Sequence, residues 1–183
     1  MKSIYSTFDL IFISLMSAFG LAIKPIVGPI INSITSSLLL PGGVIAGAIY
    51  LIWPMLALLI INRKGSAILV GIVQGTVISI TGIYGSHGII SLAIYSLPCI
   101  IIEFVYFTMS PLNPALARFV ATAAGNVSGM LFISVLFIRM PLSILLIGII
   151  PAFLFGGFAG IFANLFSIRL MKILGKSNRL HDK

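Results

Sequence analysis

The sequence predicts an all-α integral membrane protein with six transmembrane helices, both termini in the cytoplasm and a structured first outer loop. Of its 183 residues, 60% are hydrophobic and 8% are charged, and the mean hydropathy is +1.23. A soluble domain of this length has no interior large enough for that much apolar surface. Apolar runs of about 20 residues, enough to cross a bilayer as a helix, alternate with charges and with Pro and Gly clusters. None shows the alternation of about ten residues that marks a membrane β-strand.

The apolar runs define the helices and leave one broken stretch. We expect helices at about 5–23, 44–62, 66–83, 89–109, 115–138 and 142–170, within a single membrane domain that covers 1–183. Pro151 is an expected kink in the last helix. The stretch 24–43 is too apolar for a flexible linker and is interrupted by Pro25, Pro29 and Pro41. We therefore expect a structured outer loop or a re-entrant segment there. The first run has no small-residue cleavage site, so we expect it to be retained as a helix.

The basic residues orient the helices, because cytoplasmic loops retain Lys and Arg. With the N-terminus inside, only Lys24 and Arg139 of the eleven Lys and Arg residues lie outside. The net charge of +8 is therefore a topology signal. It does not indicate a nucleic-acid partner, since the charges are spread over loop ends. The tail from Lys172 to Lys183 is expected to be a short solvated end that can touch anionic membrane lipid.

The ionisable residues are too few and too scattered for an enzyme. The chain has three carboxylates (Asp9, Glu103 and Asp182) and two histidines. It contains no HExxH, Walker-type or GxSxG motif, so we expect no catalytic residues, no metal site, no cofactor and no ATP binding by this chain. The single cysteine, Cys99, lies in an apolar run and is expected to be a small buried hydrophobe.

Glu103 is the one carboxylate expected well inside a helix, where an ionisable group is a functional candidate. Arg118 begins the next helix at a comparable depth, and we expect the two side chains to form a structural ion pair. The alternative is that Glu103 cycles a proton in an autonomous carrier.

Aromatic and neutral polar residues gather towards the outer ends of the predicted helices. Flat aromatics with a few hydrogen-bonding groups suit a small heterocycle better than a sugar or an ion. The candidate substrate-binding residues are Tyr50, Trp53, Gln74, Tyr84, His87, Tyr95 and Asn126. Two alternatives stay open: the aromatics Tyr50, Trp53 and Tyr84 are also typical of a membrane-interface belt, and the two amides can bond neighbouring helices.

Small residues mark one face of the first helix. Ser14, Ala18 and Ala22 are spaced by four and form a shallow strip on which another helix backbone can approach closely. An internal helix contact and a docking site for a partner protein both fit this strip.

In this combination the chain resembles the S components of energy-coupling factor (ECF) transporters, the substrate-binding membrane subunits of prokaryotic vitamin importers. The features are six helices in about 180 residues, the Ala18-x-x-x-Ala22 motif and the long apolar first outer loop. Pro41 to Tyr50 and Gly71 to Gly75 are most similar to the branch linked with thiamine and its hydroxymethylpyrimidine precursor.

The resemblance implies a function for the strip on the first helix. Ala18 and Ala22 would dock on a transmembrane coupling subunit carried by two ATPase subunits, and Ser14 extends the strip by spacing alone. A vitamin-like ligand would bind near the outer surface under 24–43. No carboxylate is expected there to pair with a thiazolium, so a neutral pyrimidine fits better than thiamine. The alternative from another class is an autonomous channel or small exporter that forms homo-oligomers through Gly156 and Gly160.

Overall fold

The computed structural model describes residues 5–37, 43–82 and 87–174, and these are almost entirely helical. Listed in chain order, the helices are α1 (Thr7–Ala22), α2 (Lys24–Ser37), α3 (Gly43–Tyr50), α4 (Ile52–Ile61), α5 (Ser66–Thr81), α6 (Ser91–Met109), α7 (Pro114–Ile133), a π-helical turn η1 (Ser134–Ile138) and α8 (Leu142–Ile173). The predicted all-α membrane class is confirmed.

Among the described residues, four helical stretches are long and apolar enough to cross a membrane: Gly43–Ile61, Gly88–Met109, Pro114–Phe137 and Leu142–Ile173. The bent pair of α1 and α2 provides a fifth stretch, and α5 is a shorter apolar helix. This arrangement is consistent with the six predicted membrane helices.

The stretch 24–43 differs most from its prediction, because α2 makes its first part helical. α1 and α2 are joined at Ile23 and bend by 44°. Pro25 is the second residue of α2, where a missing N–H costs no hydrogen bond. Residues 38–42 of the stretch lie outside the described part of the chain. At the other end of the chain, Pro151 lies inside α8, which continues through it as one unbroken helix. The expected kink at Pro151 stays a prediction.

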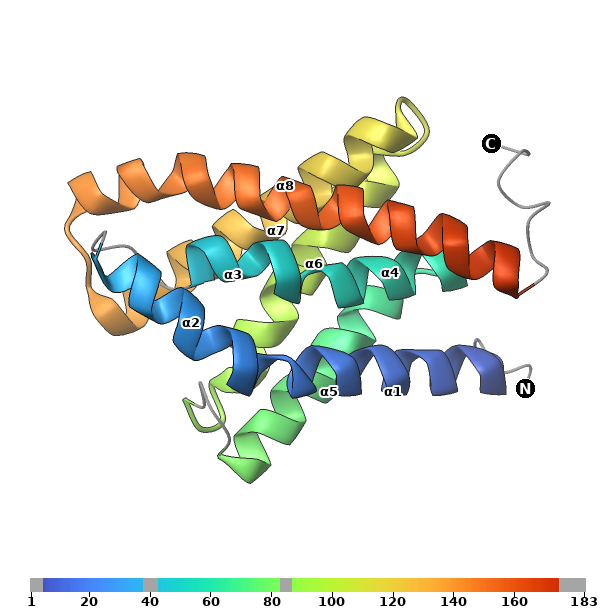
Figure 1. Ribbon diagram of the computed structural model, residues 1–183, viewed down its shortest axis with the longest axis horizontal. Helices are drawn as coiled ribbons and strands as arrows, with labels where there is room; N and C mark the ends of the chain where they lie inside the picture. The colour runs from blue at the N-terminus through green and yellow to red at the C-terminus, as the bar shows by residue number, and fades with distance from the viewer. Residues whose placement is uncertain (1–4, 38–42, 83–86, 175–183) are drawn as a thin grey trace.

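The span formed by α3 and α4 is the centre of the fold. It lies between α8 on one side and α1 on the other, while the ribbons of α5, α6 and α7 pass behind it (Figure 1). Its side chains Val44, Met55 and Leu58 are completely buried. A span covered on all sides is apolar all round, which explains why α4 has no polar face.

Glycines let α8 pack directly on α7. Gly156, Gly157 and Gly160 are buried, and a Cβ atom on Gly160 would overlap the carbonyl oxygen of Arg118. The homo-oligomer hypothesis needed Gly156 and Gly160 on the surface. It is wrong about this face, because the two glycines are used inside the chain.

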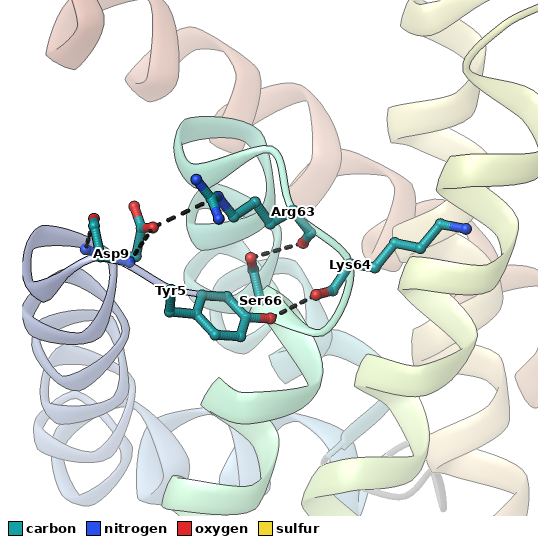
Figure 2. A network of polar contacts seen from close by, with 6 residues as sticks. Tyr5, Asp9, Arg63, Lys64 and Ser66 are labelled. Atoms are coloured by element: carbon teal, nitrogen blue, oxygen red, sulfur yellow. Dashed lines mark hydrogen bonds and ion pairs between the residues drawn. The ribbon is translucent and has the colours of Figure 1, made fainter. Parts of the chain in front are cut away.

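A polar network ties the start of α1 to the turn between α4 and α5 (Figure 2). Asp9 is buried, and its Oδ2 lies 3.7 Å from Nε of Arg63. Ser66 donates to the carbonyl of Arg63 at 2.7 Å, and the Tyr5 hydroxyl donates to the carbonyl of Lys64. Burial raises the pKa of Tyr5 above its ordinary value of 10.0.

Glu103 caps α5, and the predicted ion pair with Arg118 is wrong. Its Oε2 accepts from the backbone N–H of Gly65 at 2.6 Å, and its Oε1 accepts from those of Ala67 at 2.6 Å and Ile68 at 3.3 Å. Free N–H groups and the positive end of the helix dipole stabilise a carboxylate at this position. Within the described residues, the one salt bridge joins Asp9 and Arg63.

We expect Glu103→Gln to lower the free energy of unfolding by about 1.5–3 kcal/mol, because a charge-assisted hydrogen bond to the start of α5 is lost. The measurement is thermal or denaturant unfolding of the purified protein in detergent. Arg118→Gln is the matched control and should cost clearly less. Recovery of stability in the charge-swapped double variant, Glu103→Arg with Arg118→Glu, would restore the ion-pair interpretation.

Candidate functional site

A cavity of about 210 Å³ lies between α2, α3 and α6. Sites for drug-sized ligands measure roughly 300–1,000 Å³, so this cavity suits a single small ring better. The residues that line it are Lys24, Gly28, Asn32, Gly43, Ala46, Tyr50, His87, Ile94, Tyr95 and Ile133. In Figure 1, α2 and α3 lie at the end of the molecule opposite the N-terminus, which is the predicted outer end.

Lys24 is the central charge of this cavity and was not among the predicted site residues. It is 4% exposed, and its Nζ lies 3.5 Å from the centroid of the Tyr95 ring and 5.4 Å from that of Tyr50. The amide oxygen Oε1 of Gln74 is 3.5 Å away. Two aromatic faces and one amide oxygen surround the lysine amine in place of a carboxylate.

Close packing of α5 on α6 brings two of these residues together. At Gly71, an added Cβ atom would lie 2.6 Å from the carbonyl oxygen of Tyr95, so only glycine permits this distance. At Gly75, an added Cβ would lie 2.8 Å from the Cα atom of Leu92. The two glycines flank Gln74, which is thereby held beside the first turns of α6.

Trp53 and Gln74 lie outside the cavity lining, although Gln74 contacts Lys24, which belongs to it. The Trp53 ring stacks on Phe19 with centroids 5.5 Å apart, and both Trp53 and Gln74 approach Gly20 of α1. The indole Nε1 of Trp53 and the amide Nε2 of Gln74 are buried without a hydrogen-bond partner. Buried donors without partners are costly in an apolar interior, so both are available to a ligand that reaches them.

Asn126 joins helices and does not line the cavity. Its Nδ2 donates to the carbonyl of Val44 at 2.9 Å and to that of Ala152 at 2.8 Å, which connects α7 to α3 and α8. Gly47 lies against the amide, leaving no space for a larger residue. Both amide hydrogens are used, as the helix-bonding alternative required.

The other predicted residues are distributed as follows. Tyr50, His87 and Tyr95 line the cavity, and the His87 ring lies 4.7 Å from that of Phe137. Tyr84 lies outside the described residues. Substrate binding by these side chains stays a prediction. Lys24 had one signal in the sequence, as the only charge between two apolar segments, and it was counted there as a topology marker alone.

The small face of α1 is open to the surroundings. Ser14, Ala18 and Ala22 are all exposed, together with the larger Ile11 and Leu15 beside them. Within the described residues, the strip is therefore not buried against another helix of this chain.

The family described as "ABC-type cobalt transport system, permease component" matches residues 8–128, from α1 into the middle of α7. The chain belongs to this family. No curated protein and no solved structure matches it.

As a permease component, the chain is a membrane subunit of an ABC-type transport system of the ECF type, acts in the cell membrane and is not an enzyme. Membership also implies partner subunits of the same system. The family description names cobalt, but among the described residues no three His, Cys, Asp or Glu side chains come together as metal ligands.

Asn126→Leu should reduce the free energy of unfolding by about 1–3 kcal/mol, because the carbonyls of Val44 and Ala152 would lose their donor. Thermal unfolding in detergent measures this change. Thr108→Val is the control, since Thr108 is exposed on α6 and donates only to Phe104 of its own helix, and it should leave the melting temperature nearly unchanged. Equal melting temperatures for wild type and Asn126→Leu would contradict the bonding role of the amide.

Proposed function

We propose that this chain is the substrate-binding subunit of an ECF-type importer and that it binds a small heterocyclic vitamin or vitamin precursor with high affinity. The observation that carries the proposal is the cavity under α2, which combines a buried lysine amine with two tyrosine rings. The sequence has no nucleotide-binding motif, so energy would come from two ATPase subunits through a transmembrane coupling subunit.

The charge of the cavity narrows the ligand class. Lys24 would repel a cation, and the two described carboxylates, Asp9 and Glu103, are engaged with Arg63 and with the start of α5. A neutral or anionic ring that accepts a hydrogen bond from Lys24 and stacks on Tyr95 fits this charge. Hydroxymethylpyrimidine is our first candidate, and the positively charged thiazolium of thiamine fits less well.

The same donor set fits cobalt poorly. Divalent cobalt is bound best by imidazole, carboxylate or thiolate groups, and the cavity lining offers His87 alone of these, next to a lysine. We therefore propose an organic ligand for this chain.

The exposed strip on α1 is the proposed docking surface for the coupling subunit. Ser14, Ala18 and Ala22 present little more than backbone to the surroundings, which lets a partner helix approach closely. In a bilayer, dispersion contacts of this kind replace the hydrophobic effect as the source of helix association.

The ligand prediction uses the single tryptophan as a reporter. Hydroxymethylpyrimidine added to the purified protein should change the fluorescence of Trp53, which meets Gln74, the partner of Lys24, beside Gly20. Gln74→Leu should weaken binding by about 1–3 kcal/mol, because a buried polar partner is lost. Thr76→Val, an exposed change on the same helix, should not weaken it. A response to Co²⁺ with none to the pyrimidine would contradict the proposed ligand class.

The docking prediction concerns a bulky residue on the strip. Ala18→Trp or Ala22→Trp should abolish co-purification with the coupling and ATPase subunits, because the helix backbones are forced apart, while ligand binding by the isolated chain is retained. The matched control is Ala93→Trp, at an exposed alanine of α6, which should assemble normally.

Normal assembly of Ala22→Trp would reject the docking surface. Uptake into proteoliposomes by this chain alone, driven by a proton gradient and lost in Glu103→Gln, would reject the importer as a whole.

A further inference from the structure

A second and larger cavity lies at the other end of the molecule. It measures about 590 Å³ and is enclosed by the C-terminal ends of α4, α6 and α8 and the N-terminal turns of α7. Its lining residues are Leu59, Ile60, Asn62, Tyr106, Ser110, Pro111, Pro114, Arg118, Asn164, Ser167 and Met171. α4 and α8 end on the same side of the molecule as the N-terminus (Figure 1), which the basic residues assign to the cytoplasm.

Arg118 supplies the charge of this second cavity. Its Nε is buried and has no hydrogen-bond partner, while the hydroxyl group of Tyr106 lies beside the guanidinium. The backbone of Arg118 is fixed, because its carbonyl accepts from Thr122 at 2.9 Å and faces Gly160 of α8. The cation therefore lies in the wall of a cavity with part of its hydrogen-bonding capacity unused.

No carboxylate of the described residues neutralises Arg118. Asp9 pairs with Arg63, and Glu103 accepts from the first N–H groups of α5. The chain has only one further carboxylate side chain, Asp182, which lies outside the described residues. A partly buried guanidinium without an acid favours an anion from another molecule.

The rest of the lining matches a phosphate attached to an apolar body. Asn62, Asn164 and Ser110 bring amide and hydroxyl donors to the cavity, while Leu59, Ile60 and Met171 bring apolar surface. On the outside, Lys64, Arg169 and Lys172 are exposed at the same end of the chain. A basic pocket between helices at the cytoplasmic surface is the environment in which anionic lipid headgroups bind.

We propose that this cavity binds the phosphodiester headgroup of an anionic membrane lipid, with Arg118 as its charged anchor. The lipid is chosen over a soluble phosphate because the lining belongs largely to membrane helices and includes the apolar residues Leu59, Ile60, Pro111, Pro114 and Met171. This site is separate from the proposed substrate cavity and does not depend on the identity of the substrate.

The test measures lipid binding to the purified protein in detergent by native mass spectrometry and by melting temperature. Phosphatidylglycerol should bind and raise the melting temperature. Phosphatidylcholine, which has the same phosphodiester with a balancing positive charge, should bind at least about tenfold more weakly, as should inorganic phosphate. An equal effect of inorganic phosphate would assign the cavity to a soluble anion and overturn the proposal.

Two variants assign the effect to the cavity. Arg118→Gln should weaken phosphatidylglycerol binding about tenfold, the loss expected for a charged hydrogen bond. Arg169→Gln removes an exposed charge of the same sign outside the lining and should change it less than about twofold. If Arg118→Gln does not fold, Asn164→Leu takes its place and should also weaken binding. Unchanged binding in whichever lining variant folds would overturn the proposal.

The chain's own Asp182 is the rival occupant. Asp182→Asn should leave phosphatidylglycerol binding as it is in the wild type. A wild-type chain that binds no phosphatidylglycerol while Asp182→Asn binds it would show that this carboxylate already occupies Arg118, which would overturn the proposal for the intact chain.

Discussion

In apolar surroundings, helices are held together by close contact of their backbones, and in this chain that contact runs through glycine. Gly160 lies against the backbone carbonyl of Arg118, and Gly71 lies against that of Tyr95. Gly47 lies in the same way against the side-chain amide of Asn126. Each of these positions lies where one helix crosses another. If a side chain were added there, the helices would separate, and both cavities would lose their walls.

The buried polar groups are of two kinds, those with hydrogen-bond partners and those without. Glu103 and Asn126 are fully engaged with backbone groups and hold helices together. By contrast, the Nε2 of Gln74, whose Oε1 contacts Lys24, lies outside the lining of the first cavity, and the Nε of Arg118 lies in the wall of the second, each buried without a partner. Because buried polar groups are normally satisfied, such atoms beside a cavity are what a ligand would engage.

Helix positions could be predicted from the sequence because the length of an apolar run and the charges that end it are local properties. The interaction partners of the charged side chains could not be predicted in the same way. Arg118 is near Glu103 along the chain, yet the carboxylate turns to the start of α5, where backbone N–H groups offer a better partner. Lys24 was read as an external charge, since nothing in its neighbours reveals that the chain bends at Ile23 and carries it inwards.

Of the predicted aromatic residues, Tyr50 and Tyr95 line the cavity, and their place near outer helix ends was identifiable from the topology; Trp53 does not line it. The roles of the two amides could not be separated. Gln74 and Asn126 are both amides within apolar helices, and only the packing shows that Asn126 meets two free carbonyls while Gln74 meets a lysine.

The bend at Ile23 also has a mechanical consequence. α1 carries the exposed strip, α2 covers the first cavity, and a single residue joins them. A helix of 14 residues is about 21 Å long, so a change of about 10° at this joint moves the far end of α2 by about 4 Å. The first residue of α2, Lys24, lies next to the pivot and would hardly move. A small rotation about Ile23 would thus open the rim of the cavity while Lys24 stays in place.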